Sequence, residues 1–202
     1  MTASFVTIGH SSRELDEFLG MLRVAGVAWL VDVRAFPHSR SHPVFNIEVL
    51  PETLARVRIG YRHMPALGGR RARQAGVDPH LNALWREPGF HNYADYALGE
   101  CFAAALAELV ALGRAQRVAL MCAEAVWWRC HRRIITDYLL LNGQAVEHLL
   151  GPGHSVRASP TPGAQRTAQG KIVYPAADHG VLRVPDAIVV PPRRRGGAPA
   201  KS

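Results

Sequence analysis

The side chains most able to take part in catalysis or ligand binding are concentrated between residues 122 and 132. Cys122 and Glu124 stand at the start of this segment, and Arg129-Cys130-His131-Arg132 stands at its end. A thiol, a carboxylate and an imidazole supply a nucleophile and groups that can carry protons. Arginines beside them favour the binding of carboxylate or phosphate groups. The segment is therefore typical of a catalytic site for an anionic substrate.

Cys122 is the first candidate nucleophile, with His131 as its base and Arg129 as its electrostatic partner. It ends an apolar run, Arg117–Cys122, and a predicted helix over Cys130–Leu141 follows the loop. Backbone N–H groups and the dipole at a helix N-terminus favour a thiolate. The layout is similar to the strand–Cys–loop–Arg–helix cradle of cysteine phosphatases and rhodaneses, although the Cys-x6-Arg spacing is one residue longer and the loop lacks glycine. The alternative is that Cys122 is a small core residue.

Glu124 has two chemical interpretations. It is a general acid or base whose pKa burial raises, or a carboxylate that stabilises a positively charged, sugar-like transition state. In the second case the reaction is cleavage of a glycosidic bond, with Trp127 or Trp128 stacked on the base. The alternative is a structural ion pair with Arg34 or Arg132.

A metal site is the alternative use of Cys122, Cys130 and His131. Thiolates and an imidazole are ligands of zinc, but the C-x7-C-H string lacks the paired short spacing of known zinc sites. The sequence therefore predicts no cofactor, with a metal ion at these three residues as the less favoured alternative.

Short apolar runs that alternate with helical patterns position these side chains. The runs show uniform apolarity, which is typical of parallel strands buried on both faces. This predicts an α/β fold with an open, mostly parallel sheet, Rossmann-like and three-layered, with helices on both faces. The expected strands are Ser4–Gly9, Ala28–Val33, Tyr61–Leu67, Arg117–Cys122 and Val146–Leu150. The expected helices cover Leu15–Ala25 after a capping box at Ser11–Glu14, Val49–Val57, Tyr93–Leu112 and Cys130–Leu141.

Ligands of such sheets bind outside the carboxyl ends of the strands. Asp32 and Arg34 lie two apart on the second strand and at its end, so their side chains share a face, as site residues or as a structural ion pair. The predicted catalytic residues are Cys122, Glu124, His131 and Asp32. The predicted substrate-binding residues are His10, Ser11, Arg34, Ser39, Arg40, Gly68, Gly69, Tyr96, Trp127, Arg129 and Arg132.

The basic charge of the chain is concentrated in its C-terminal part. Of a net charge of +8, residues 154–202 carry eight Lys and Arg against two acids, hence +6, and they hold seven of the fourteen prolines. We expect an α/β domain over 1–153 and a Pro-rich basic appendage over 154–202, with short edge strands at Lys171–Tyr174 and Ala187–Val190 and disorder from Pro191 onward. Such a tail has non-specific affinity for nucleic acid.

Composition also bears on compartment and partners. No apolar run approaches the roughly 20 residues of a membrane-spanning helix, and no signal sequence is visible. The chain has three cysteines, a low and odd number that does not suit a disulfide framework. This composition favours a reducing compartment. We therefore expect a cytoplasmic protein without a membrane partner, and its oligomeric state stays open.

The motifs taken together resemble the bacterial family catalogued as domain of unknown function 488, over about residues 4–150. Trp127 departs from the pattern, which leads one to expect proline there. The resemblance implies an α/β fold with the motifs converging at one site, and some members are labelled as related to DNA repair. The motifs are Thr7-Ile8-Gly9-His10-Ser11, Asp32-Val33-Arg34 with Pro37 and Ser39-Arg40, Leu67-Gly68-Gly69-Arg70, Tyr93-Ala94-Asp95-Tyr96, and Leu120-Met121-Cys122-Ala123-Glu124 leading to Arg129-Cys130-His131-Arg132.

The expected function is an enzyme acting on an anionic substrate, a nucleotide or nucleic acid. One alternative is a non-catalytic nucleic-acid-binding module that uses the basic tail and exposed arginines. A further alternative is a metal- or redox-sensing protein that uses Cys122 and Cys130.

Overall fold

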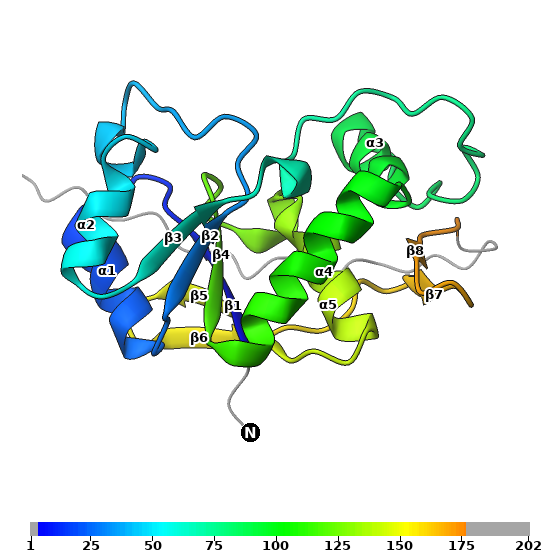
Figure 1. The fold of residues 1–202 in the computed structure, drawn as a ribbon. Helices are drawn as coiled ribbons and strands as arrows, with labels where there is room; N and C mark the ends of the chain where they lie inside the picture. The colour runs from blue at the N-terminus through cyan, green and yellow to red at the C-terminus, as the bar shows by residue number, and fades with distance from the viewer. Residues whose placement is uncertain (1–3, 177–202) are drawn as a thin grey trace, which may run out of the picture.

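The computed structural model describes residues 4–176, which form a six-stranded sheet with helices on both faces (Figure 1). The strand order is β3-β2-β4-β1-β5-β6, and all neighbours are parallel except β5 and β6. The strands are β1 (Phe5–Gly9), β2 (Trp29–Asp32), β3 (Gly60–His63), β4 (Val118–Cys122), β5 (Val146–Gly151) and β6 (His154–Arg157). The predicted α/β class, with its mostly parallel sheet, is confirmed.

The helices cover the sheet in two layers (Figure 1). The side chains of β1 show why both layers are needed: Phe5 packs in the buried cluster that includes α4 and α5, whereas Val6 and Ile8 pack in the cluster that includes α1 and α2. Burial on both faces is what makes the strands uniformly apolar. The helices are α1 (Leu15–Val24), α2 (Leu50–Arg56), α3 (Pro88–Ala97), α4 (Glu100–Ala115) and α5 (Arg132–Leu141).

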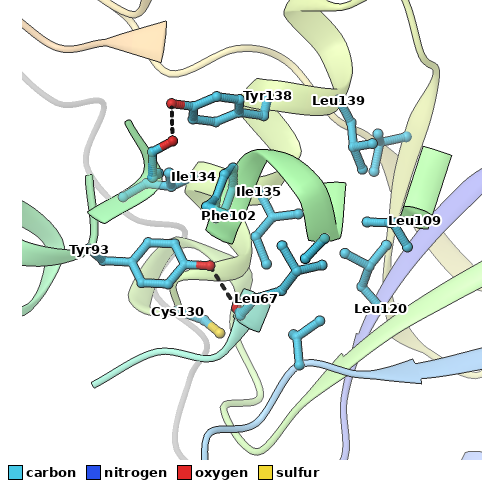
Figure 2. Close-up of a cluster of buried hydrophobic side chains, with 14 of the residues drawn as sticks. Leu67, Tyr93, Phe102, Leu109, Leu120, Cys130, Ile134, Ile135, Tyr138 and Leu139 are labelled. Atoms are coloured by element: carbon cyan, nitrogen blue, oxygen red, sulfur yellow. Dashed lines mark hydrogen bonds between the residues drawn. The ribbon is translucent and has the colours of Figure 1, made fainter. Parts of the chain in front are cut away.

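Two tyrosine hydroxyls anchor the cluster on the α4 and α5 side (Figure 2). The Tyr93 hydroxyl donates to the Leu67 carbonyl over 2.7 Å, and the Tyr138 hydroxyl donates to the Ala97 carbonyl over 2.9 Å. Both buried hydroxyls thus have a partner, which removes the cost of burying them. Cys130 belongs to the same buried cluster (Figure 2).

The predicted capping box at Ser11–Glu14 is wrong. Helix α1 begins at Leu15, and its N-cap residue Glu14 makes no side-chain capping hydrogen bond. Ser11 instead has a left-handed backbone, with φ at 45°, and its N–H donates to the carbonyl of Ala123. The chain after β1 is therefore tied to the loop after β4, and this tertiary contact displaces the local cap.

The single helix predicted over Tyr93–Leu112 is also wrong in extent. Two helices, α3 and α4, replace it, and they meet at Gly99 with a bend of 78°. Within the part of the chain that the structure describes, no single helix is long and apolar enough to cross a membrane. The bent pair α3 and α4 passes that test together, by length and composition only.

Part of the C-terminal segment packs against the α/β domain. Strand β6 joins the edge of the main sheet, and β7 (Gln165–Arg166) pairs with β8 (Ile172–Val173) in a small second sheet. The buried Tyr174 donates its hydroxyl to Asp137 of α5 over 2.9 Å, and the N–H of Thr161 donates to the same carboxylate over 2.8 Å. The strand predicted at Ala187–Val190 and the disorder predicted from Pro191 lie outside the described residues.

Candidate functional site

A pocket of about 380 Å³ lies where the loops after β2, β3 and β4 meet. Four side chains of its wall carry sulfur or imidazole nitrogen, namely Cys122, Cys130, His131 and His38. Its charged lining residues are Glu87, Glu124, Arg34, Arg70 and Arg129. The structure thus brings six of the predicted site residues to one cavity at the carboxyl edge of the sheet, namely Cys122, Glu124, His131, Arg34, Gly69 and Arg129.

Cys122, Cys130 and His131 form a compact cluster because β4 ends at Cys122 and α5 begins just after His131. Their candidate ligand atoms all lie within 4.8 Å of one another. The His131 Nδ1 atom is 3.7 Å from the Cys130 Sγ and 4.0 Å from the Cys122 Sγ. Its other ring nitrogen, Nε2, lies 2.8 Å from the Val33 carbonyl oxygen. Because a carbonyl only accepts, Nε2 carries the proton and the Nδ1 lone pair faces the two sulfurs.

The two thiols differ in how readily they ionise. The fully buried Arg132 donates its Nε–H to the Cys130 Sγ over 3.2 Å, and its backbone N–H lies 3.5 Å from the same sulfur. Burial by itself raises the pKa of Cys130, but the Cys122 thiol and the Arg132 charge together bring that pKa well below its usual range. Two effects raise the pKa of Cys122 well above its usual range: the larger is the hydrogen bond that the Cys122 thiol donates to Cys130, and the second is burial.

Cys130 rather than the expected Cys122 is therefore the thiol that favours the charged form. The helix predicted from Cys130 begins two residues later, at Arg132. The first N–H of α5 and the Arg132 side chain consequently face Cys130, and Cys122 at the strand end becomes the donor to it.

Glu124 is exposed on the wall of the pocket. Neither Arg34 nor Arg132 pairs with its carboxylate among the ion pairs of residues 4–176; Arg132 instead donates its Nη2–H to the Glu124 backbone carbonyl. The structural ion pair weighed above is thus not formed, and the side chain stays available to a ligand in the pocket.

Asp32 and Arg34 form a buried ion pair, which is the structural alternative weighed above. The Asp32 carboxylate accepts from Arg34 Nη2 over 2.6 Å and from the Tyr61 hydroxyl over 2.8 Å. Arg34 Nη2 also donates to the Phe45 carbonyl over 2.6 Å. Asp32 does not line the pocket, and Arg34 reaches it with most of its donors already used.

His10 belongs to the same network and does not line the pocket. Its ring stacks on Phe45 with centroids 4.6 Å apart, its Nδ1 lies 3.0 Å from the Ser11 carbonyl, and its Nε2 lies 3.3 Å from Arg34 Nη1. Burial and the Arg34 charge lower its pKa from 6.5 to about 4. His10 is therefore neutral in the folded protein at neutral pH.

This histidine makes the fold sensitive to acid. The unfolded chain takes up the His10 proton near pH 6.5, whereas the folded protein takes it up only near pH 4. Its contribution to stability is complete above about pH 6.5 and is lost as the pH falls toward 4. We expect the protonation of His10 to lower the free energy of unfolding by about 2 kcal/mol between pH 7 and pH 5. Urea titrations across this range should show a shallower pH dependence in His10→Gln, and an unchanged one in a control at the exposed His80, His80→Gln.

Two predicted binding residues, Gly68 and Gly69, shape the wall of the pocket. Gly69 lines it, and a Cβ there would lie 2.8 Å from His131 Nδ1. A Cβ at Gly68 would lie 2.9 Å from the Ala35 Cα. Both glycines thus permit close approach of the chain rather than cradling an anion by themselves.

The remaining predicted binding residues lie away from the pocket lining. Trp127 stacks on His148, with ring centroids 4.3 Å apart, and therefore covers the sheet. Tyr96 donates to the Ala66 carbonyl over 2.8 Å beneath the guanidinium of Arg71. Arg132 is buried behind Cys130. Ser11, Ser39 and Arg40 also fall outside the lining.

The site list predicted from the sequence omitted several lining residues. Arg70 follows the Gly68-Gly69 pair directly, and that position was the available signal for it. Phe36, Glu87 and Phe90 reach the pocket only because the loop after β2 and helix α3 fold over it, and no local pattern marks them. Tyr93 also lines the pocket, and the signal for it was the Tyr93-Ala94-Asp95-Tyr96 motif, of which the predicted site list kept only Tyr96.

Comparison with known proteins yields one match. The family model described as "Domain of unknown function DUF488" matches residues 14–139, which is more than half of the chain. The matched region includes both cysteines of the cluster, His131, Glu124 and the Asp32–Arg34 pair. No curated protein matches the chain, and no solved structure does.

Proposed function

The chain belongs to the DUF488 family, and from this premise we propose that it is an enzyme that acts on an anionic substrate in the pocket described above. The observation that carries the proposal is the composition of the wall. Two carboxylates, a Cys–Cys–His cluster and three guanidiniums line one cavity at the carboxyl edge of a parallel sheet. Structural packing does not require such a concentration of reactive and charged groups, whereas catalysis does.

The arginines favour a substrate that carries phosphate or carboxylate groups. Arg70 and Arg129 are both exposed and line the pocket, so their donors can reach a ligand. Guanidinium groups bind such anions through paired, charge-assisted hydrogen bonds. Phe36 and Phe90 add apolar surface to the same wall, which suits a ring such as a nucleobase. We therefore propose a nucleotide or a nucleic acid as the substrate class.

Glu124 is the residue that we place in the proton-transfer role. Its carboxylate lines the pocket without an ion-pair partner among the described residues. The thiols are less suited to attack a substrate directly, because Cys122 favours its protonated form and Cys130 is 2% exposed and held by Arg132. The geometry therefore favours hydrolysis or group transfer assisted by a carboxylate, and cleavage of a glycosidic bond belongs to this class.

The proposed compartment is the cytoplasm. All three cysteines of the chain are free thiols, and a protein that keeps two of them in its functional site needs a reducing environment.

A kinetic comparison tests this function. The full chain would be assayed against nucleotides, phosphate esters and oligonucleotides with damaged bases. Glu124→Gln should lower kcat by about 100-fold or more, since general acid–base groups contribute that much. Arg129→Ala should raise KM by about 10-fold, which corresponds to about 1.4 kcal/mol of lost binding.

Matched controls are Glu52→Gln, an exposed carboxylate of α2, and Arg114→Ala, an exposed guanidinium of α4. Both should keep the activity of the unmodified chain. Activity in Glu124→Gln equal to that of the unmodified chain, or no turnover of any anionic substrate in the panel, would overturn the proposal.

A further inference from the structure

We infer that Cys122, Cys130 and His131 bind one zinc ion whose fourth ligand position faces the pocket. This inference rests on the proposed function, because it names the group that activates a nucleophile in the same site. The three residues come from the end of β4 and the start of α5, and no disulfide occupies the sulfurs.

The spacing of the ligand atoms matches a tetrahedral ion. Zinc lies about 2.3 Å from a thiolate sulfur and about 2.0–2.1 Å from an imidazole nitrogen, so a sulfur and a nitrogen on one ion are about 3.6 Å apart. The Nδ1 atom of His131 lies 3.7 Å from one sulfur and 4.0 Å from the other. The nitrogen is therefore within a few tenths of an ångström of ligand spacing from both sulfurs. The two sulfurs lie within 4.8 Å of each other, against about 3.8 Å on a tetrahedral zinc ion, so a shift of about 1 Å or less closes the site.

His131 already has the orientation of a metal ligand. Its Nε2–H donates to the Val33 carbonyl over 2.8 Å, which directs the lone pair of Nδ1 toward the sulfurs. Histidines that bind metals commonly donate their second ring N–H to a carbonyl or carboxylate in this way. Gly69 also packs closely against the ring, since a Cβ there would lie 2.8 Å from Nδ1 and 3.2 Å from Cγ, and this contact restricts the rotation of the ring.

Arg132 supports the sulfur ligand Cys130. Its guanidinium is 1% exposed, and its donors go to the Cys130 sulfur and the Glu124 carbonyl rather than to a carboxylate. A guanidinium that donates to a sulfur favours its thiolate form, which is the form that binds a metal. Two thiolates balance the charge of one divalent zinc, so the site as a whole keeps the positive charge of Arg132 and attracts an anionic substrate.

The donor set selects the ion and its role. Two thiolates and one imidazole favour zinc over calcium or magnesium, which prefer oxygen. Three protein ligands and an open fourth position are typical of catalytic zinc, whereas structural zinc has four protein ligands. All three residues line the pocket, so the open position is reachable by water and substrate.

Glu124 completes the arrangement as a carboxylate two residues from the ligand Cys122. A bound water loses one proton to Glu124, and the resulting hydroxide forms a bond to the electrophilic atom of the substrate. The bond to the leaving group breaks, and that group departs with the electron pair and takes the proton from Glu124. The step is a hydrolysis and needs no oxidant or reductant.

Metal content and cobalt spectroscopy test the inference. The full chain would be purified under reducing conditions without a chelator, and zinc would be measured by plasma mass spectrometry. We expect one zinc per chain. Replacement by Co²⁺ should give thiolate-to-cobalt charge-transfer absorption and the strong visible bands of tetrahedral cobalt. Cys122→Ser, Cys130→Ser and His131→Gln should each weaken zinc binding by about 100-fold or more.

The control is Cys101→Ser, since Cys101 is an exposed thiol on α4 outside the cluster. It should keep the zinc and the cobalt spectrum. If a ligand variant fails to fold, as judged by circular dichroism, the cobalt spectrum of Cys101→Ser still reports thiolate ligation, because only Cys122 and Cys130 then remain. A reduced chain that binds no zinc when the ion is in excess, or variants that keep it, would overturn the inference.

The same experiment separates this inference from the proposed function. Glu124→Gln should keep the zinc and lose turnover. Turnover that persists after a chelator has removed all zinc would support the proposed enzyme and contradict the zinc site. Stoichiometric zinc in a chain that turns over no anionic substrate would support the zinc site and contradict the proposed enzyme.

Discussion

Asp32→Asn should lower the free energy of unfolding by about 3 kcal/mol or more. The substitution leaves the Arg34 guanidinium buried without its carboxylate, and Arg34 is 5% exposed. It also replaces the charged carboxylate that accepts a hydrogen bond from the Tyr61 hydroxyl with a neutral amide. Removing one member of a buried ion pair is expensive because the remaining charge cannot reach water. Urea denaturation monitored by circular dichroism measures the loss.

The control for this substitution is Glu52→Gln on α2. Glu52 pairs with Arg56 as well, but the side chains of both are 74% exposed. An exposed pair of this kind contributes about 0.5 kcal/mol or less. Equal effects of the two substitutions would contradict the structural role of Asp32. Loss of turnover in Asp32→Asn at undiminished stability would return Asp32 to the catalytic role that its position at the carboxyl end of β2 predicts.

Gly9→Ala should destabilise the fold by about 3 kcal/mol and reduce turnover by about 100-fold. A Cβ at Gly9 would lie 1.9 Å from the Glu124 carbonyl oxygen and 2.9 Å from the Ala125 Cα. Because both contacts are with backbone, no side-chain rotation relieves them. The loop after β4 must move, and it carries the Glu124 carboxylate. Urea denaturation and the kinetic assay described above measure the two effects.

Gly20→Ala is the matched control, since a Cβ at Gly20 of α1 meets nothing within 4 Å. Alanine in a helix is favoured over glycine by about 1 kcal/mol, so this variant should be as stable as the unmodified chain or more stable. A Gly9→Ala chain with unchanged stability and activity would show that the loop after β4 tolerates displacement.

The class of the fold could be predicted from the sequence because its cause is local in the chain. A parallel strand covered on both faces needs apolar residues at every position, and runs such as Val118–Cys122 display this directly. The rule that ligands bind at the carboxyl ends of parallel strands then placed Cys122 and Glu124 correctly at the pocket. The prediction of one helix over Tyr93–Leu112 was wrong in extent for a physical reason as well. The chain turns at Gly99 between α3 and α4, and tertiary packing selects this turn.

The sequence by itself determined that residues 122–132 belong to the site, since this segment joins a buried strand to a helix and carries the reactive groups together. Only the tertiary structure decided how those groups are used. Cys130 is the favoured thiolate because Arg132 folds back onto it, and His131 presents Nδ1 because the Val33 carbonyl, far away in the sequence, binds Nε2. Side-chain direction, tautomer and charge depend on partners that come close only when the sheet has formed, and no local pattern records them.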